Sequence, residues 1–140
     1  MKSALIFSLI YICGSLSLTA QSVKGTWQIL NKKGEPESLI KVYEENGYLY
    51  GRCIELLEAA DLLTCKKCKG KDKGKSLEGM LLFKDCKNDG TKWSEGKILD
   101  PEKGKHYDCQ VSLKEDNVLK VRGYVGNPLF GKTLLWYRVK

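Results

Sequence analysis

Two cysteines, Cys65 and Cys68, have the residue type and the spacing that come closest to a reactive centre in this chain. They lie in the stretch TCKKCKGKDKGK, residues 64–75, which also contains six lysines. A Cys-x-x-Cys pair can ligate zinc, exchange electrons as a thiol–disulfide centre, or close a small loop as a disulfide. Each chemistry predicts different surroundings in the rest of the sequence.

These surroundings favour the disulfide. A structural zinc site usually takes four ligands from two clusters, whereas this sequence has one such pair and a single histidine, His106. A redox pair sits at the start of a helix, and the Lys-Gly-Lys-Asp-Lys-Gly segment after Cys68 does not sustain a helix. We therefore predict a Cys65–Cys68 disulfide with no metal and no cofactor. A thiol–disulfide or metal-binding protein centred on this pair is the alternative.

The N-terminus predicts export. Lys2 gives a basic start, residues 4–12 (ALIFSLIYI) are apolar, and Ala20 is a small residue before Gln21. This is the pattern of a secretory signal peptide, residues 1–20, whose removal leaves residues 21–140 as one domain. A lipid-modified Cys13 is the alternative, but such processing prefers a small residue at the position of Ile12. We expect a soluble periplasmic or secreted protein.

Export changes what the other cysteines and the charges predict. Without Cys13 five cysteines remain, and thiols tend to pair in an oxidising compartment, so at least one lacks a partner within the chain. Without Lys2 the chain keeps 23 basic residues against 17 acidic ones. A basic exported protein suits an anionic lipid or polysaccharide surface and not nucleic acid. The six lysines either solvate an exposed loop or form a basic lip that attracts an anion.

Short strands separated by turns organise the mature chain. Asn46-Gly47 is a strong hairpin pattern, and residues 58–76 form a long stretch without a strand. We expect this stretch to be a disulfide-pinned flap over the entrance of the fold. Eight antiparallel strands can close into an up-and-down barrel without free edges. The predicted strands are Gly25–Leu30, Ser38–Tyr43, Tyr48–Leu57, Leu77–Lys84, Trp93–Leu99, Lys105–Leu113, Val118–Val125 and Lys132–Val139.

The two ends of the mature chain suggest how this barrel closes. Gly25-Thr-Trp27 opens the first strand and Trp136-Tyr-Arg138 ends the last, and these strands become neighbours in a closed meander. Arg138 can then stack over the Trp27 indole as a cation–π pair. This arrangement resembles the lipocalin and fatty-acid-binding superfamily, in which a Gly-x-Trp motif packs beneath a basic residue of the last strand.

A second set of motifs covers nearly the whole mature chain. These motifs are Gly25-x-Trp27, GYLYG at 47–51, Cys65-x-x-Cys68, Gly79, W-x-x-G-x-I-x-D-P at 93–101, Gly104-x-x-Tyr107, Arg122-Gly-Tyr124, Gly131 and Trp136-x-Arg138. With them the sequence resembles an uncharacterised bacterial family of exported lipocalin-like proteins, domain of unknown function 2147. The resemblance implies a small exported barrel that binds a small ligand, and it transfers no catalytic residue. Cys53 and Cys86 stand where it leads us to expect other residue types.

Strand alternation supplies the candidate ligand contacts. Asp100, Tyr107 and Arg122 form no catalytic set, because Asp100 suits a turn cap and Arg122 is out of phase with inward Val121. We predict a non-catalytic all-β barrel that binds a small lipophilic molecule, which can carry a negative charge. An OB-like module that binds polyanions through a basic aromatic surface is a further alternative. The pocket-lining candidates are Trp27, Tyr48, Tyr50, Ile98, Tyr107, Val121 and Trp136.

Overall fold

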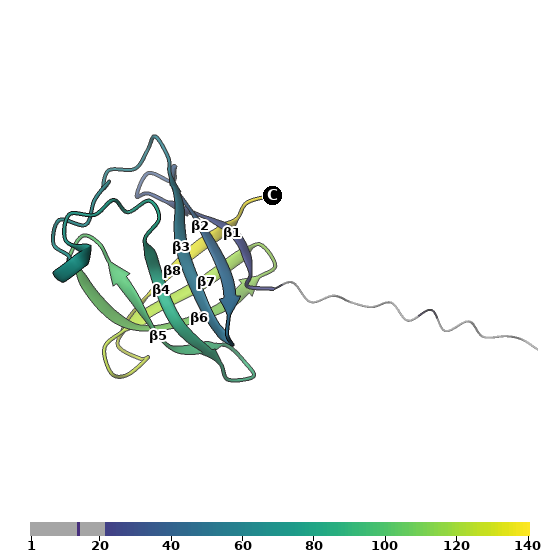
Figure 1. Cartoon of the computed structure of the whole chain (residues 1–140). Helices are drawn as coiled ribbons and strands as arrows, with labels where there is room; N and C mark the ends of the chain where they lie inside the picture. The colour runs from purple at the N-terminus through teal and green to yellow at the C-terminus, as the bar shows by residue number, and fades with distance from the viewer. Residues whose placement is uncertain (1–13, 15–21) are drawn as a thin grey trace, which may run out of the picture.

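Residues 22–140 of the computed structural model form eight antiparallel strands that close into a barrel (Figure 1). The structure describes these residues together with Gly14. Each strand pairs with the next, and β8 pairs with β1, which confirms the predicted all-β up-and-down barrel. The predicted signal peptide, its cleavage site and Cys13 lie outside the described residues. The strands are β1 Gly25–Leu30, β2 Pro36–Glu45, β3 Tyr48–Leu56, β4 Leu81–Asn88, β5 Trp93–Asp100, β6 Lys105–Glu115, β7 Val118–Tyr124 and β8 Gly131–Arg138.

Turn residues set the ends of these strands. Asn46 and Gly47 both have positive φ (52° and 84°), as a two-residue hairpin between β2 and β3 requires. The predicted fourth strand begins four residues too early, because Leu77 is buried in a cluster outside the strand and β4 starts only at Leu81. The connection of residues 57–80, here called the flap, contains the short 3₁₀ turn η1, Gly70–Asp72.

Large side chains fill the middle of the barrel. Trp27, Phe83 and Trp136 are fully buried, and the Phe83 and Trp136 ring centroids lie 5.9 Å apart. Two glycines make room for this packing. A Cβ atom on Gly51 would overlap the Phe83 ring, and one on Gly96 would overlap the Cys86 sulfur. The core therefore depends on large and small residues at facing positions.

The two ends of the barrel differ. At the end called here the Arg138 end, the Arg138 guanidinium carbon lies 4.2 Å from the centroid of the Trp27 ring. The same guanidinium donates to the carbonyl oxygens of Ser22, Lys24 and Asp116 at 2.6–3.1 Å. The opposite end, called here the flap end, carries the connections 31–35, 57–80, 101–104 and 125–130 (Figure 1).

Candidate ligand-binding site

At the flap end, the inward face of the barrel is not fully covered. Leu134 pairs with Val121, and paired residues share a face of the sheet, so Leu134 belongs to the interior face with Trp136. Leu134 is nevertheless 39% exposed, whereas Val121 is fully buried. Within residues 22–140, β1 pairs with β8 only at Trp27–Arg138 and Gln28–Tyr137. The seam between these strands is therefore short and lies toward the Arg138 end.

Other side chains of the interior face lie toward the same end of the barrel. Ile29, Leu56 and Tyr107 are partly buried and pack against the main core, and Ile98 is a buried member of that core. We call these five residues the mouth ring. Lys132 pairs with Gly123, whose missing Cβ would lie 3.3 Å from Ile98, so the exposed lysine shares the interior face. The mouth ring is therefore apolar apart from the Tyr107 phenol, and the Lys132 amine lies beside it.

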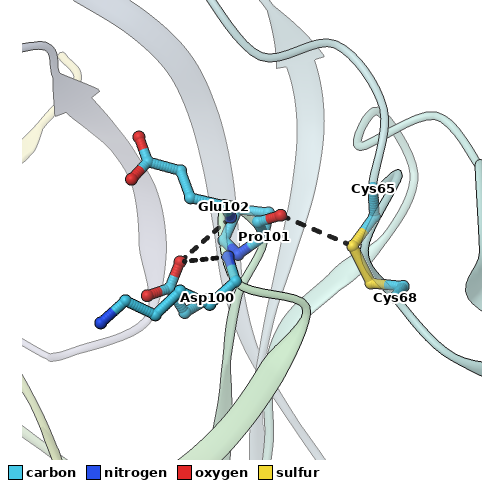
Figure 2. Close-up of a disulfide and its surroundings, with 6 residues drawn as sticks. Cys65, Cys68, Asp100, Pro101 and Glu102 are labelled. Carbon is cyan, nitrogen blue, oxygen red and sulfur yellow. Dashed lines mark hydrogen bonds between the residues drawn. A yellow bond between two sulfur atoms is a disulfide. The ribbon is translucent and has the colours of Figure 1, made fainter.

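The flap packs beside the barrel rather than over its mouth. Cys65 and Cys68 are joined in a disulfide, their Cα atoms 5.3 Å apart, and both are buried with Leu77 and Leu99. Leu99 follows inward Ile98, so it points away from the interior. Figure 2 shows the disulfide facing the β5–β6 turn, where the Cys65 sulfur contacts the Pro101 carbonyl oxygen at 3.8 Å. The flap therefore packs on the outer face of β5, and the entrance predicted beneath it stays a prediction.

Two cavities lie at the ends of the barrel, outside its core. One of about 620 Å³ at the Arg138 end has mostly polar walls, which include Lys24, Glu44 and Lys92, above Trp93 and Leu113. The other, of about 380 Å³, lies between the flap and the start of β6. None of the seven sequence-predicted contacts lines either cavity. The lysine-rich stretch around Cys68 and Lys69 was the sequence pattern that pointed to the second cavity. The other lining residues come from turns and strand ends that only the closed barrel brings together.

The comparison with protein families agrees with this architecture. Residues 25–138 match the family described as "Uncharacterized protein conserved in bacteria (DUF2147)". The chain belongs to the DUF2147 family. A solved structure, described as protein HP1028 from the human pathogen Helicobacter pylori of the lipocalin family, superposes with a TM-score of 0.74. At 21% identity, over 86% of this chain and 85% of that one, the likeness establishes the lipocalin-like fold. No curated protein matches the chain.

In this DUF2147 barrel the seven predicted contacts fall into three groups. Trp27, Val121 and Trp136 are fully buried in the middle of the core, and Ile98 and Tyr107 belong to the mouth ring. The inward placement of Tyr48 and Tyr50 is wrong. These two tyrosines are partly exposed on the other face of β3, where Tyr50 stacks on Tyr43 at 5.6 Å and Lys87 lies over Tyr48.

Leu49 and Cys53 occupy the interior face of β3 instead, on either side of Gly51. Both faces of this strand are apolar, so its alternation does not reveal which one is buried. The decisive residue is Gly51, because only a residue without a side chain leaves space for the Phe83 ring. The alternation of Gly51 with Leu49 and Cys53 was therefore the available sequence pattern for the inward face.

The remaining cysteines of the DUF2147 barrel are buried free thiols, Cys53, Cys86 and Cys109. A hydrogen bond with Cys86, together with burial, raises the pKa of Cys109 far above its ordinary value. Burial likewise raises the pKa of Cys53. The thiols of Cys53 and Cys109 therefore favour the protonated form, and protonated thiols are poor nucleophiles and poor metal ligands. Among the described residues no three His, Cys, Asp or Glu side chains are grouped to hold a metal ion.

The two other polar residues weighed from the sequence have structural partners. Asp100 accepts hydrogen bonds from the backbone N–H groups of Glu102 and Lys103 at 3.0 and 3.3 Å, which is the turn cap expected of it (Figure 2). Arg122 faces outward and donates to Thr133 and to the Pro128 carbonyl oxygen. Neither side chain reaches the interior. Within the part of the chain that the structure describes, no helix is long and apolar enough to cross a bilayer.

Proposed function

We propose that this protein is an exported, non-catalytic carrier of a small apolar molecule with a negatively charged end, bound at the mouth ring. The exposure of Leu134 on an otherwise buried interior face carries this proposal. An apolar chain would cover Leu134, Ile29 and Tyr107, and its anionic end would meet the amine of Lys132. Lipocalin-like barrels provide such a mouth where strands diverge at one end.

The structure favours this function over the two alternatives. A thiol–disulfide centre needs a reactive sulfur that solvent can reach, and the Cys65 and Cys68 side chains are almost completely buried. An OB fold is a five-stranded Greek-key barrel, whereas these strands follow one another in sequence order around the barrel. The proposal also includes export through residues 1–20, which the N-terminal sequence supports.

Binding of a fluorescent long-chain fatty acid and of the corresponding alcohol tests the proposal. Leu134→Lys should weaken binding of both probes about tenfold or more, because it places a charge on the apolar ring. Lys132→Ala should weaken binding of the acid alone, because only the acid uses the amine. Lys120→Ala, which removes an exposed lysine from β7, is the matched control.

Native mass spectrometry of protein purified from the periplasm or the medium complements this titration. We expect a retained small molecule whose release follows unfolding. Equal binding of both probes by the wild type and by Leu134→Lys, with no retained molecule, would remove the support for a mouth-ring site.

A further inference from the structure

Two large apolar side chains stand in solvent at the flap end. Leu129 and Phe130, in the β7–β8 connection, are 81% and 77% exposed. Their loop is held in place by hydrogen bonds. Arg122 Nε donates to the Pro128 carbonyl oxygen at 2.7 Å, and the Phe130 N–H donates to the Asn127 carbonyl oxygen at 3.0 Å. The backbone therefore keeps both side chains away from the core, and exposed apolar groups of this kind mark interaction sites.

Basic side chains are concentrated at the same end. The 380 Å³ cavity is lined by Lys69, Lys103, Lys105 and His106, with Asp72 as its acidic residue. All six lysines of residues 66–75 are exposed. The four connections of the flap end together contain nine lysines and six acidic residues, and residues 66–75 hold the densest group of lysines, with one acid among them.

One hydrogen bond joins the apolar loop to β6, the strand whose first residues line the basic cavity. The Gly126 N–H, at the start of the β7–β8 connection, donates to the Asp108 carboxylate at 3.2 Å. Asp108 lies on β6 three residues after Lys105, which lines the cavity. Figure 1 shows the flap and the β7–β8 connection at the same end of the barrel. The apolar tip and the basic cavity therefore lie at the same end of the barrel.

We propose that the flap end docks on the surface of an anionic lipid bilayer. Leu129 and Phe130 enter the boundary between headgroups and acyl chains, and the lysines contact lipid phosphates. Polysaccharides and nucleic acids offer anions without an apolar layer, and zwitterionic bilayers offer an apolar layer without net charge. An anionic bilayer alone offers both. Docking does not need a molecule bound in the barrel, so this inference is independent of the proposed function.

Co-sedimentation with vesicles tests the docking surface. The vesicles contain either phosphatidylcholine alone or equal parts of phosphatidylcholine and phosphatidylglycerol. We expect binding to the anionic vesicles only, and a loss of about tenfold or more in the partition coefficient for Leu129→Ser/Phe130→Ser. Lys69→Glu/Lys105→Glu should also weaken binding and reduce its salt dependence. Val139→Ser, an exposed apolar residue beyond β8, is the matched control.

Three further measurements make the result decisive. The intact mass of the protein expressed from the full chain identifies its N-terminus. This control is needed because the apolar residues 4–12, if still present, would themselves bind lipid. Phe130→Trp should give fluorescence that shifts to the blue with anionic vesicles, which reports insertion even if the double serine variant unfolds. Either of two results would overturn the proposal. The wild type could bind the anionic vesicles no more strongly than the phosphatidylcholine vesicles, or the double serine variant could bind the anionic vesicles as strongly as the wild type. If the wild type and the double serine variant bind dextran sulfate equally and neither binds vesicles, the surface is assigned to soluble polyanions instead.

Discussion

Glu37, near the start of β2, lies close to two other carboxylates at the flap end. Burial is the largest cause that raises the pKa of Glu37 above its ordinary value of 4.5, and the negative charges of Asp61 and Glu102 add to it. The ionised form of Glu37 is therefore less favourable in the folded protein than in the unfolded chain. Its contribution to stability improves as the pH falls through the folded-state pKa, which is the reverse of a salt-bridged carboxylate.

Replacing Glu37 by glutamine should therefore stabilise the fold at neutral pH. The gain should shrink as the pH falls and vanish below the ordinary pKa of 4.5, where the wild-type carboxyl is neutral in both states. The difference in melting temperature between variant and wild type, followed from pH 7 downward, measures this effect. Glu115→Gln, an exposed acid at the other end of the barrel, controls for the loss of one negative charge. A gain at neutral pH that persists in acid would contradict the prediction.

Individual residues show how far the sequence alone could go. The pairing of Trp27 with Arg138 could be predicted from the sequence. Trp27 belongs to a recognisable motif in the first strand, Arg138 belongs to one in the last strand, and closure of the barrel makes these strands neighbours. The mouth ring could be predicted only in part. The inward direction of Ile98 and Tyr107 follows from alternation, whereas the exposure of Leu134 depends on where the β1–β8 pairing stops. That point is a property of the closed barrel and leaves no local pattern in either strand.

At the scale of elements, the flap is attached to the barrel through the β5–β6 turn. Gly104 ends this turn with φ of 65°, and a Cβ atom there would overlap the carbonyl group of Lys67 in the flap. The Cys65 N–H donates to the Lys75 carbonyl oxygen, and the Gly74 N–H donates to the carbonyl oxygen of Cys65. The long lysine-rich connection is therefore folded around its disulfide and held against the turn.

Gly104→Ala should detach the flap from the turn. We expect it to cost more stability than Gly126→Ala, since Gly126 has a similar φ of 72° but open space around its Cβ position. The shared backbone strain is of order 1 kcal/mol, and steric overlap in Gly104→Ala adds to it. Urea unfolding gives both values, and limited trypsin digestion reports cleavage at the flap lysines. Equal stability and equal cleavage in the two variants would show that the flap does not rely on this contact.

At the scale of the whole molecule, closure depends on a short seam and one arginine. The β1–β8 contact has two residue pairs, and Arg138 adds hydrogen bonds to three carbonyl groups and its stacking on Trp27. The sequence predicted the closed barrel because the strand count, the turns and the two terminal motifs agree. It did not predict the length of the seam, because the register between first and last strands is set by all the strands between them.

Arg138→Lys should therefore weaken closure although it keeps the charge. A lysine amine cannot reproduce the planar fork that reaches three carbonyl groups, so we expect a loss of roughly 1–3 kcal/mol in unfolding free energy. Arg122→Lys, which alters an arginine that holds one loop, should cost less. Urea unfolding followed by tryptophan fluorescence measures both changes. If Arg122→Lys lowers the unfolding free energy as much as Arg138→Lys does, the seam has no special role in stability.

The short seam also determines how the protein responds to a pulling force. β1 begins and β8 finishes at the Arg138 end, where the two strands are antiparallel neighbours (Figure 1). A tensile load on the two termini would peel these strands apart one hydrogen bond at a time, because the load acts across the strand direction. Arg138 carries that load first. The β1–β8 seam should therefore separate at low force, even though the packed core makes spontaneous unfolding of the barrel slow.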